Sequence, residues 1–490
     1  MKRLIVIVFI IFGAFLTLCL YRTYAYDTSV VEEVPSTTDL EYTFKIGNSS
    51  IKQITVDSGE TRYYDIVLGN PNNAKISYGV YYEMVSPSTK PDGYSIEYTS
   101  KSTGNSTGKV DKNGNITLNL VVTNASSSTV TVKLGTVAGY VNGGELTLGS
   151  GQVIIPKALV NAVELITNLN DGTTGDSGSG VYKIIHSAIP AGSSATGSEI
   201  PAVTDYRYYG PSPNNYICLD MEGQSTCPDK HLYRIIGSIY DEKENTNRLK
   251  LIKATPLTDG TTSEFSWDYR VFNNGGVVYS NIWATITSGN YSNSLTSGSQ
   301  LMKLLNNGAW WNGTSGSYYN NSTTATTVNF TNYKLSDKAK SYVTTSRYYL
   351  GGYNNNPPLT TAMYGYERGT LRYDTSRPLY WDGNVGLMYP SDYGYAAGNT
   401  CVTGTNLYNY DGGCYQKDWL NNTSKNEWLL SPNSGDYCSA FALYSSSSGF
   451  VNDNGNFVNS TLYVRPVFYL SSSVSISSGD GSSTNPYILS

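Results

Sequence analysis

Short runs of alternating hydrophobic and polar residues dominate the part of the chain between residues 42 and 155. They are separated by stretches of turn-forming residues such as Gly-Asn-Pro-Asn-Asn at 69–73. The clearest of these runs lie at 63–68, 76–84, 116–122 and 130–134. About seven strands of this kind within one domain length are typical of an immunoglobulin-like β-sandwich, which we predict for 42–155. The segment carries no residue pattern that indicates chemistry, so we expect a spacer or scaffold.

The pattern changes after this region. Residues 156–203 contain one short amphipathic run at 158–168, followed by Gly/Ser/Thr-rich stretches at 172–180 and 191–198. The first predicts a short helix, and the others are typical of flexible linkers. We therefore predict a linker for 156–203.

A second and larger domain is predicted from residue 204 to residue 490. Strands are expected at 232–240 and 248–254, and the polar residues between them favour a hairpin. Amphipathic helices are expected at 299–306 and 335–343. The remaining segments are rich in Gly, Ser, Asn and Tyr, and we expect cysteine loops and buried residues such as Trp310 to hold them in place.

The N-terminus indicates export. Lys2 and Arg3 precede an uncharged apolar run at 4–20, and a polar segment follows. A basic start before such a run directs a chain to a membrane. Residues 1–26 are predicted to be a signal peptide or a membrane anchor, and both alternatives remain open. Residues 27–41 form a polar stalk. We therefore expect an exported protein, either anchored at the cell surface or secreted.

Composition narrows the class of partner. Only 14% of the residues are charged, the net charge is −5, and the chain has 44 Tyr but 2 His. An acidic chain of this kind lacks the basic footprint of a nucleic-acid-binding protein. Tyrosine together with Ser, Gly and Asn is frequent in binding surfaces, although tyrosine also suits half-buried strands.

The cysteines agree with export. Cys218 and Cys227 flank a short turn, Cys401 and Cys414 flank a Gly/Asn/Tyr loop, and both spacings suit loop-closing disulfides. Cys438 has no obvious partner. A zinc site is disfavoured because no CxxC motif or histidine cluster accompanies these cysteines.

Several short motifs resemble one group of proteins. They lie at 206–216 with the following cysteine turn, at 232–237 (LYRIIG), 428–432 (WLLSP), 464–467 (VRPV) and 485–487 (NPY). In this order they resemble bacterial exported proteins with a C-terminal C-type-lectin-like domain. This fold is shared by formylglycine-generating (sulfatase-modifying) enzymes, intimin-type adhesins and hypervariable receptor-binding proteins. The resemblance covers about 204–490 and implies an α+β domain with a large irregular loop region that binds ligands.

Catalytic chemistry is less well supported than binding. Formylglycine-type enzymes hold copper with a closely placed reactive cysteine pair, and Cys438 has no second cysteine at short spacing. His186 falls in the predicted linker and His231 beside the cysteine turn, so no Ser-His-Asp arrangement is evident. We predict no catalytic residues. A carbohydrate-active or sulfatase-modifying-like enzyme on the same scaffold remains an alternative, because fold does not settle function.

Two segments are predicted to form the ligand surface, because aromatic faces stack on ligands and Asn and Ser supply hydrogen bonds. The first, at 379–395, contains Trp381, Tyr389, Tyr393 and Tyr395. The second, at 444–459, contains Tyr444, Asn452, Asn454 and Asn456.

Alternatives remain for several of these positions. Asp453 lies among the asparagines and makes calcium a possible ligand, although lectin triplets such as Glu-Pro-Asn are missing. No other metal or cofactor is expected. Core packing is the alternative for Trp381 and Trp428, and Arg465 is expected to make a structural ion pair or bind carbonyl groups.

These observations predict a cell-surface or secreted adhesion protein. Its partner would be a glycan or a protein of a host or a neighbouring cell, and the N-terminal segment would contact the membrane. The alternatives are an enzyme on the same scaffold and a structural envelope protein that contacts only its own copies.

Overall fold

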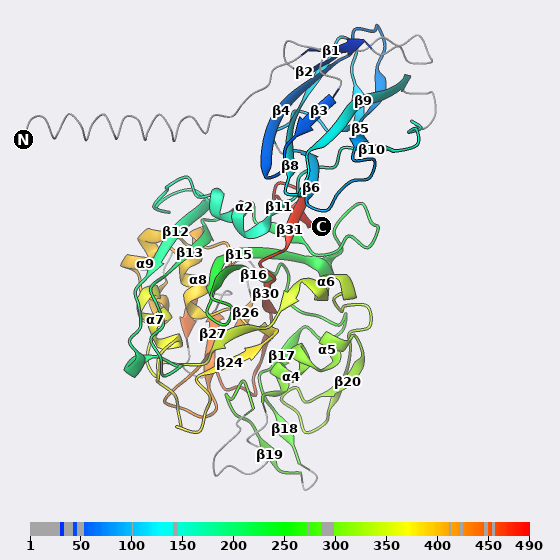
Figure 1. Cartoon of the computed structure of the whole chain (residues 1–490). Helices are drawn as coiled ribbons and strands as arrows, with labels where there is room; N and C mark the ends of the chain where they lie inside the picture. The colour runs from blue at the N-terminus through cyan, green and yellow to red at the C-terminus, as the bar shows by residue number, and fades with distance from the viewer. Residues whose placement is uncertain are drawn as a thin grey trace, which may run out of the picture. The chain divides into compact units, whose positions relative to one another are not determined.

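The computed structural model describes residues 30–33, 43–46, 53–99, 101–140, 146–272, 275–285, 298–410, 413–421, 425–444, 449–452 and 456–490. The predicted signal or anchor at 1–26 lies outside these ranges. None of the helices in the described ranges has the length and apolar character needed to cross a membrane. The chain divides into two compact units, Met1–Ala158 and Leu159–Ser490, and each is described by itself (Figure 1).

The described residues of the first unit form two antiparallel five-stranded sheets. One has the order β1 (Val30–Glu33), β2 (Thr43–Ile46), β4 (Glu60–Gly69), β8 (Asn115–Asn124) and β6 (Tyr94–Tyr98). The other has the order β10 (Gln152–Ile154), β5 (Ile76–Ser86), β9 (Val130–Tyr140) and β3 (Gln53–Val56), and β7 (Thr107–Val110) also pairs with β5. The strands expected at 63–68, 76–84, 116–122 and 130–134 are confirmed within β4, β5, β8 and β9.

Both sheets contribute alternate residues to one hydrophobic core. Tyr64, Ile66 and Leu68 of β4 are buried in it together with Ile76 and Val80 of β5. Because side chains alternate between the two faces of a strand, this pattern places one face of each sheet inward. The first unit is therefore an all-β, two-layer structure.

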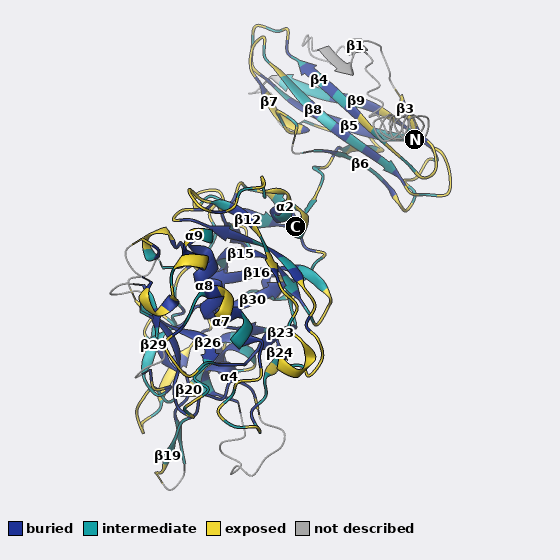
Figure 2. Cartoon of the chain, turned by 90° about the vertical axis from the view of Figure 1, so that its left-hand side faces the viewer, coloured by how far each residue is buried: buried dark blue, intermediate teal, exposed yellow. Residues whose placement is uncertain are grey.

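The second unit is built around an eleven-stranded sheet. Its main path runs β11 (Val160–Asn161), β31 (Ser475–Ser478), β32 (Tyr487–Leu489), β14 (Tyr216–Cys218), β15 (Leu232–Asp241), β16 (Thr246–Lys253), β30 (Val467–Leu470) and β22 (Val343–Thr344). Beside this path, β13 (Val203–Tyr209) pairs with β15 and with β12 (Gly180–His186), and β25 (Val385–Gly386) pairs with β30. The expected hairpin is confirmed as β15 and β16, and Figure 2 shows that these central strands are buried.

The region predicted to be a linker contains elements of this sheet. Within 156–203 the structure has β11, the helix α2 (Ala162–Asn168), β12 and the 3₁₀ helix η1 (Ala191–Ser193). β12 pairs with β13 along its whole length, so it is integral to the second unit. The Gly/Ser-rich stretches on either side of β12 concealed its alternating pattern. The helix starts at Ala162, because the side chain of Asn161 accepts hydrogen bonds from the next free amide groups.

A five-stranded sheet and three two-stranded sheets complete the β structure of the second unit within the described residues. The sheet has the order β17 (Glu264–Ser266), β29 (Thr461–Tyr463), β26 (Asn426–Pro432), β27 (Ala440–Tyr444) and β28 (Phe450–Asn452). The two-stranded sheets are β18 (Arg270–Val271) with β19 (Val277–Val278), β20 (Ser315–Tyr318) with β21 (Thr326–Asn329), and β23 (Ser346–Tyr349) with β24 (Tyr380–Gly383).

Short helices lie between these strands. They are α4 (Gln300–Asn306), α5 (Ala309–Asn312), α6 (Asp337–Tyr342), α7 (Thr360–Glu367), α8 (Pro390–Ala396), α9 (Asn399–Gly404), and the 3₁₀ helices η2 (Asp229–His231), η3 (Leu407–Asn409) and η4 (Tyr415–Lys417). The helices expected at 299–306 and 335–343 are confirmed as α4 and α6. Ser299 and Ser336 cap their first turns.

Tryptophan residues anchor the irregular segments of the second unit. Trp267, Trp310, Trp419 and Trp428 are among its largest fully buried side chains. The Trp267 ring meets that of Trp428 edge-on at 5.9 Å, and the Trp428 indole N–H donates to the Phe265 carbonyl at 2.8 Å. The expected anchoring role of Trp310 and core role of Trp428 are therefore confirmed.

Arg465 makes the structural ion pair that the sequence predicted. Its Nε lies 2.7 Å from Glu427 Oε2, and its Nη2 donates to the Leu420 carbonyl at 2.8 Å. Both charged side chains are about 1% exposed. A buried charge is costly unless it is paired and hydrogen-bonded, so this pair holds β26 to the segment that precedes β30.

Replacing Arg465 with methionine is expected to lower the free energy of unfolding of the second unit by about 3–5 kcal/mol, because Glu427 is left buried without the guanidinium of Arg465. All seven tryptophans lie in this unit, so urea unfolding followed by tryptophan fluorescence measures it selectively. Lys243→Met, which removes a surface pair with Glu244, is the matched control and should leave stability close to that of the parent. An Arg465→Met protein as stable as this control would contradict the prediction.

Candidate functional site

The second unit contains a cavity of about 690 Å³ beside β12. Its walls come from β12, the loop that follows α2, the helices α7 and α9, and Tyr395 of α8. Figure 1 shows these elements together along one side of the unit. Segments far apart in the sequence therefore meet around one space, as is usual for ligand sites.

Four aromatic side chains, Tyr182, His186, Tyr364 and Tyr395, form a ring cluster in the cavity wall. The imidazole of His186 stacks on Tyr364 with ring centres 3.8 Å apart and an angle of 5° between the planes. Tyr395 meets His186 edge-on at 5.5 Å. The Tyr182 hydroxyl donates to the Tyr395 carbonyl at 2.7 Å. These contacts give the wall a defined shape.

The strand pattern places two of these rings. Side chains along β12 alternate between its faces, so Tyr182, Ile184 and His186 point to the same side. The opposite wall depends on Gly398, which has φ +95° and directly precedes α9. A Cβ at this position would collide with the Gly175 carbonyl, so glycine permits the loop after α2 to approach α9.

A network of buried ions supports the ring cluster. Asp205 Oδ2 lies 2.9 Å from both His186 Nε2 and Arg207 Nη2. Arg207 Nη1 lies 2.9 Å from Asp392 Oδ1, whose second oxygen lies 2.5 Å from Lys250 Nζ. The side chains of Asp205, Arg207, Asp392 and Lys250 are each about 1% exposed. Because each charge has an opposite partner, burial does not leave any of them uncompensated.

Burial decides the protonation state of His186, although Asp205 acts in the opposite direction. Burial lowers the pKa of His186, and its effect outweighs that of Asp205, which favours the charged form. Burial would raise the pKa of Asp205, but Arg207 and His186 hold it well below its ordinary value. With Asp205 ionised and His186 neutral, Nε2 donates and Nδ1 is an acceptor. Within the described part of the chain, no side chain or backbone group is hydrogen-bonded to this Nδ1.

A second buried pair lies behind Tyr364. The Arg368 guanidinium stacks on the Tyr364 ring with a separation of 3.5 Å, so the ring is held between Arg368 and His186. Glu367 accepts a hydrogen bond from the Ser391 amide at 2.9 Å and contacts Arg368 at 3.3 Å. Burial raises the pKa of Glu367 to about 7, although Arg368 and Ser391 act against it.

Three of the predicted ligand residues, Tyr389, Tyr393 and Tyr395, do not form an outward-facing aromatic surface. They are at most 2% exposed. The Tyr389 hydroxyl donates to the Tyr349 carbonyl at 3.1 Å, and the Tyr393 hydroxyl donates to the Gly449 carbonyl at 2.7 Å. The expectation of an outer face is wrong here because 390–396 form a helix, α8, whose residues are all buried. Tyr395 alone reaches the cavity.

The remaining predicted ligand residues lie elsewhere in the second unit. Trp381 is partly buried on β24 against Tyr348 at 5.8 Å. Tyr444 stacks on Phe450 at 5.0 Å and its hydroxyl donates to Asn456, which is buried and in turn donates to the Asn452 carbonyl. Asp453 and Asn454 lie outside the described residues, so calcium binding at this turn remains a prediction.

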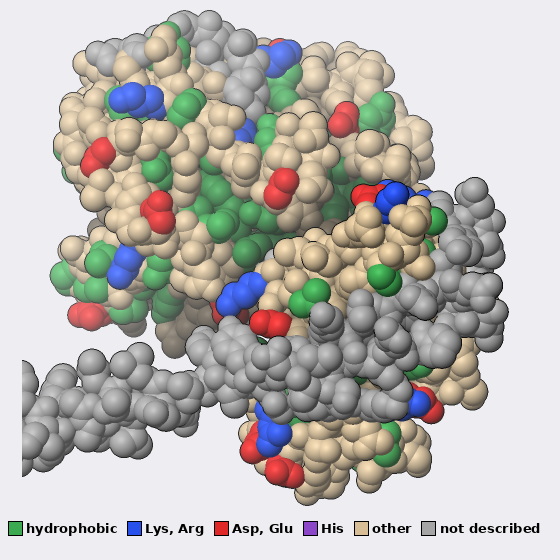
Figure 3. Space-filling model, turned by 90° about the horizontal axis from the view of Figure 1, so that it is seen from above, with side chains coloured by type: hydrophobic (Ala, Val, Ile, Leu, Met, Phe, Trp, Pro, Cys, Tyr) green, Lys and Arg blue, Asp and Glu red, His purple; other side chains and the backbone are tan. Residues whose placement is uncertain are grey.

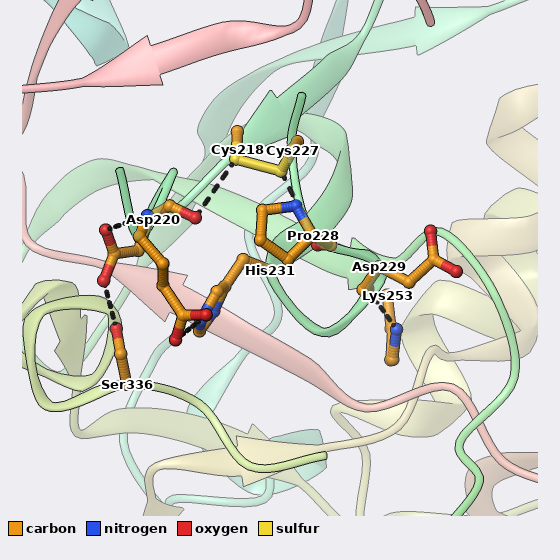
Figure 4. The surroundings of a disulfide bond; sticks show 9 residues. Cys218, Asp220, Cys227, Pro228, Asp229, His231, Lys253 and Ser336 are labelled. Carbon is orange, nitrogen blue, oxygen red and sulfur yellow. Dashed lines mark hydrogen bonds and ion pairs between the residues drawn. A yellow bond between two sulfur atoms is a disulfide. The ribbon is translucent and has the colours of Figure 1, made fainter. Parts of the chain in front are cut away.

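Both predicted disulfides are present, linking Cys218 to Cys227 and Cys401 to Cys414. Beside the first, ligand atoms of Asp220, Glu222 and His231 lie within 4.8 Å of one another, a spacing that suits a metal ion (Figure 4).

Protein groups already contact these carboxylates. Lys230 Nζ lies 2.9 Å from Glu222, His231 lies 3.1 Å from it, and the Ser336 hydroxyl donates to Asp220 at 2.6 Å. A metal ion would have to compete with Lys230, so the cluster is better explained as the polar support of the cysteine loop.

Cys438 does not resemble a reactive thiol. It is buried and free, and its sulfur donates to Asp436 Oδ1 at 3.1 Å. Burial and this carboxylate raise its pKa to about 12. The other cysteines of the described ranges are in disulfides. The described cysteines therefore do not supply the pair that formylglycine-type chemistry requires.

Charged side chains are scattered over the face shown in Figure 3. Several of them lie as neighbouring pairs of opposite charge, and hydrophobic side chains are also visible on this face. No family model, curated protein or solved structure matches this chain. The functional argument therefore depends on the cavity and its residues.

His186, Tyr182 and Tyr364 were missed in the sequence. The first two fell in the predicted linker, and the third lay in no motif. The alternating run Tyr-Lys-Ile-Ile-His at 182–186 is the one signal that could have revealed a strand with two rings on one face.

Glu367 is expected to make stability depend on pH. Its pKa is raised in the folded protein, so its contribution is fully present below the unfolded pKa of about 4.5 and is lost as the pH rises to about 7. Relative to Glu367→Gln, the parent should lose on the order of 3 kcal/mol of unfolding free energy over this interval. Urea unfolding at several pH values measures the difference, and a difference independent of pH would contradict the assignment.

Cys438 is expected to resist alkylation by iodoacetamide in the folded protein at pH 8, because the thiol is buried and its pKa is about 12. It should be modified fully in urea without a reducing agent. Peptide mass spectrometry measures both states. Rapid modification of the folded protein would instead support a reactive role for this cysteine.

Proposed function

We propose that this chain is an exported surface-binding protein whose ligand occupies the cavity beside β12. In this proposal the first unit is an immunoglobulin-like spacer, and the second is a C-type-lectin-like ligand-binding domain. The two-layer first unit and the β-rich second unit with short helices and long irregular segments support this organisation. The basic and apolar N-terminus supports export, either with a membrane anchor or with a cleaved signal.

The ring cluster above the buried ion network is the observation that carries this proposal. A cavity of about 690 Å³ lies within the usual range for ligand sites. Its aromatic wall is fixed by stacking and by buried ion pairs, so little order has to be imposed when a ligand binds. Asn170, Asn399 and Thr403 add polar groups to the lining. The partner we propose is a glycan or a protein of a host or a neighbouring cell.

An enzyme on the same scaffold is supported by one observation, the His186–Asp205 pair. An imidazole oriented by a carboxylate, with its second nitrogen free of protein partners in the described structure, can serve as a general base. However, no hydroxyl or thiol of the described residues is hydrogen-bonded to that nitrogen, so a nucleophile is not in place. Binding therefore fits the arrangement better than catalysis.

The proposal is tested with two tryptophan substitutions on α7. Thr361 is exposed and lines the cavity, whereas its exposed neighbour Ala362 does not. The parent is expected to bind on a glycan array or a protein array, and Thr361→Trp should weaken that binding at least tenfold by filling the cavity. Ala362→Trp should leave it unchanged.

Thermal unfolding of both variants shows whether the fold is retained. No binding on either array, with or without calcium, would contradict the proposal, as would binding that Thr361→Trp leaves intact. Ordered arrays of the purified chain, seen by electron microscopy, would instead favour a structural envelope protein.

A further inference from the structure

β12 is an edge strand of the large sheet. It pairs with β13 on one side. On its other side the described structure has one isolated bridge, between Val181 and Asn170, and no further strand. Such an edge presents unpaired N–H and C=O groups, and natural proteins commonly shield it. Lys183 and Ile185 on this strand are exposed, and Ile185, at 70%, is the most exposed large hydrophobic side chain in the described ranges.

Hydrogen bonds around β13 show which main-chain groups face the open edge. In an antiparallel pair, residues alternate between those bonded to the partner strand and those whose N–H and C=O point away from it. The register pairs Val181 with Tyr208 and Ile185 with Thr204. The Tyr208 carbonyl accepts from the Trp419 indole at 3.1 Å, and the Thr204 carbonyl accepts from Asn247 at 3.0 Å. Both carbonyls therefore point away from β12.

A third contact lies on β12 itself. Asn170 Nδ2 donates to the Val181 carbonyl at 3.1 Å from outside the sheet. All three contacts agree that Val181, Lys183 and Ile185 direct their main-chain groups to the open edge. The Val181 carbonyl is occupied by Asn170. The N–H and C=O groups of Lys183 and Ile185 have no hydrogen-bond partner among the described residues.

The cavity runs along this edge. Lys183, Ile184, Ile185 and His186 all line it, although their side chains alternate between the two faces of the strand. Because residues that point to opposite faces of β12 all line the cavity, the cavity must extend along the open edge of the strand, where the two faces meet. The four residues span about 13 Å at a rise of about 3.3 Å per residue. This length accommodates about four residues of an extended chain.

The charges in the cavity favour an acidic occupant. Its lining includes Lys183 but no Asp or Glu, and its histidine, His186, is neutral. No ion-pair partner of Lys183 lies within the described part of the chain. A carboxylate on a ligand that runs along β12 would therefore meet an uncompensated positive charge.

We propose that the open edge of β12 binds an extended peptide that carries an acidic residue, by addition of a strand to the sheet. The outward main-chain groups of Lys183 and Ile185 supply the backbone hydrogen bonds, as in other strand-addition complexes. An apolar side chain of the peptide packs on the ring cluster, and its carboxylate pairs with Lys183. This inference depends on the proposed function, because it names the ligand class of the same cavity.

The first experiment uses a phage-displayed library of linear eight-residue peptides and the full chain. Selected peptides are expected to carry an acidic residue next to alternating apolar residues. N-methylation at alternate peptide positions should weaken binding at least tenfold, because those amides donate to β12, while methylation at the intervening positions should have little effect. Fluorescence anisotropy measures each dissociation constant.

The second experiment uses substitutions on the open edge of β12. Ile185→Pro removes an outward N–H without removing a bond to β13, and proline is tolerated at such edge positions. Ile185→Pro should weaken binding of the selected peptide at least tenfold. Ile185→Thr retains the N–H and is the matched control, with an expected change of less than threefold. Lys183→Glu should weaken binding of an acidic peptide and strengthen binding of the analogue in which lysine replaces the acidic residue. Thermal unfolding shows whether each variant is folded.

Three results would overturn the peptide assignment. They are the absence of selected peptides, binding without the alternating methylation pattern, and concentration-dependent dimerisation that Ile185→Pro abolishes. The last would show that the edge pairs with a second copy of the chain. Glycan binding that Thr361→Trp blocks, in the absence of peptide binding, would leave the proposed function standing and remove only the peptide assignment.

Discussion

The candidate site depends on the buried ion network that joins β13, β16 and α8. Asp205 and Arg207 come from β13, Lys250 from β16 and Asp392 from α8. Each charge is stable in the interior only while its partners remain in place, so the three elements have one favourable arrangement. His186 is tied to this network through Asp205. The position of the imidazole in the cavity wall follows from this tie, and burial keeps the imidazole neutral.

Tyrosine has two roles in this unit. Some tyrosines, such as Tyr389 and Tyr393, fill the core and satisfy their hydroxyl groups with main-chain carbonyls. Others, such as Tyr182, Tyr364 and Tyr395, are also largely buried but line the cavity. A tyrosine-rich composition therefore did not indicate an adhesive outer surface. The tyrosines that line the cavity are a small part of the 44 in the chain, and the structure rather than the composition identifies them.

The disulfides and the irregular segments show how a unit with short strands stays ordered. The Cys218–Cys227 bond closes a loop that contains Asp220 and Glu222. Asp220 accepts a hydrogen bond from Ser336, and Glu222 contacts His231, which follows the loop. Closing a loop limits the freedom of the unfolded chain, and hydrogen-bonded polar groups then give that loop one conformation. In segments without a cysteine, buried tryptophans give the folded chain one conformation by packing into the core. Order in these segments thus comes from tertiary contacts and not from local propensity.

For Arg465 the sequence predicted an ion pair or carbonyl binding but did not identify Glu427, which lies 38 positions away. Local sequence determined the alternating strands of the first unit, the β15–β16 hairpin, the helices α4 and α6 and the two disulfides. Each depends on residues close in sequence or on an unambiguous partner type. Tertiary structure alone decided that β12 belongs to the large sheet, that Tyr393 is interior and that His186 faces a cavity. These outcomes arise from contacts between residues up to about two hundred positions apart, such as Arg207 with Asp392, and a local pattern carries no record of such contacts.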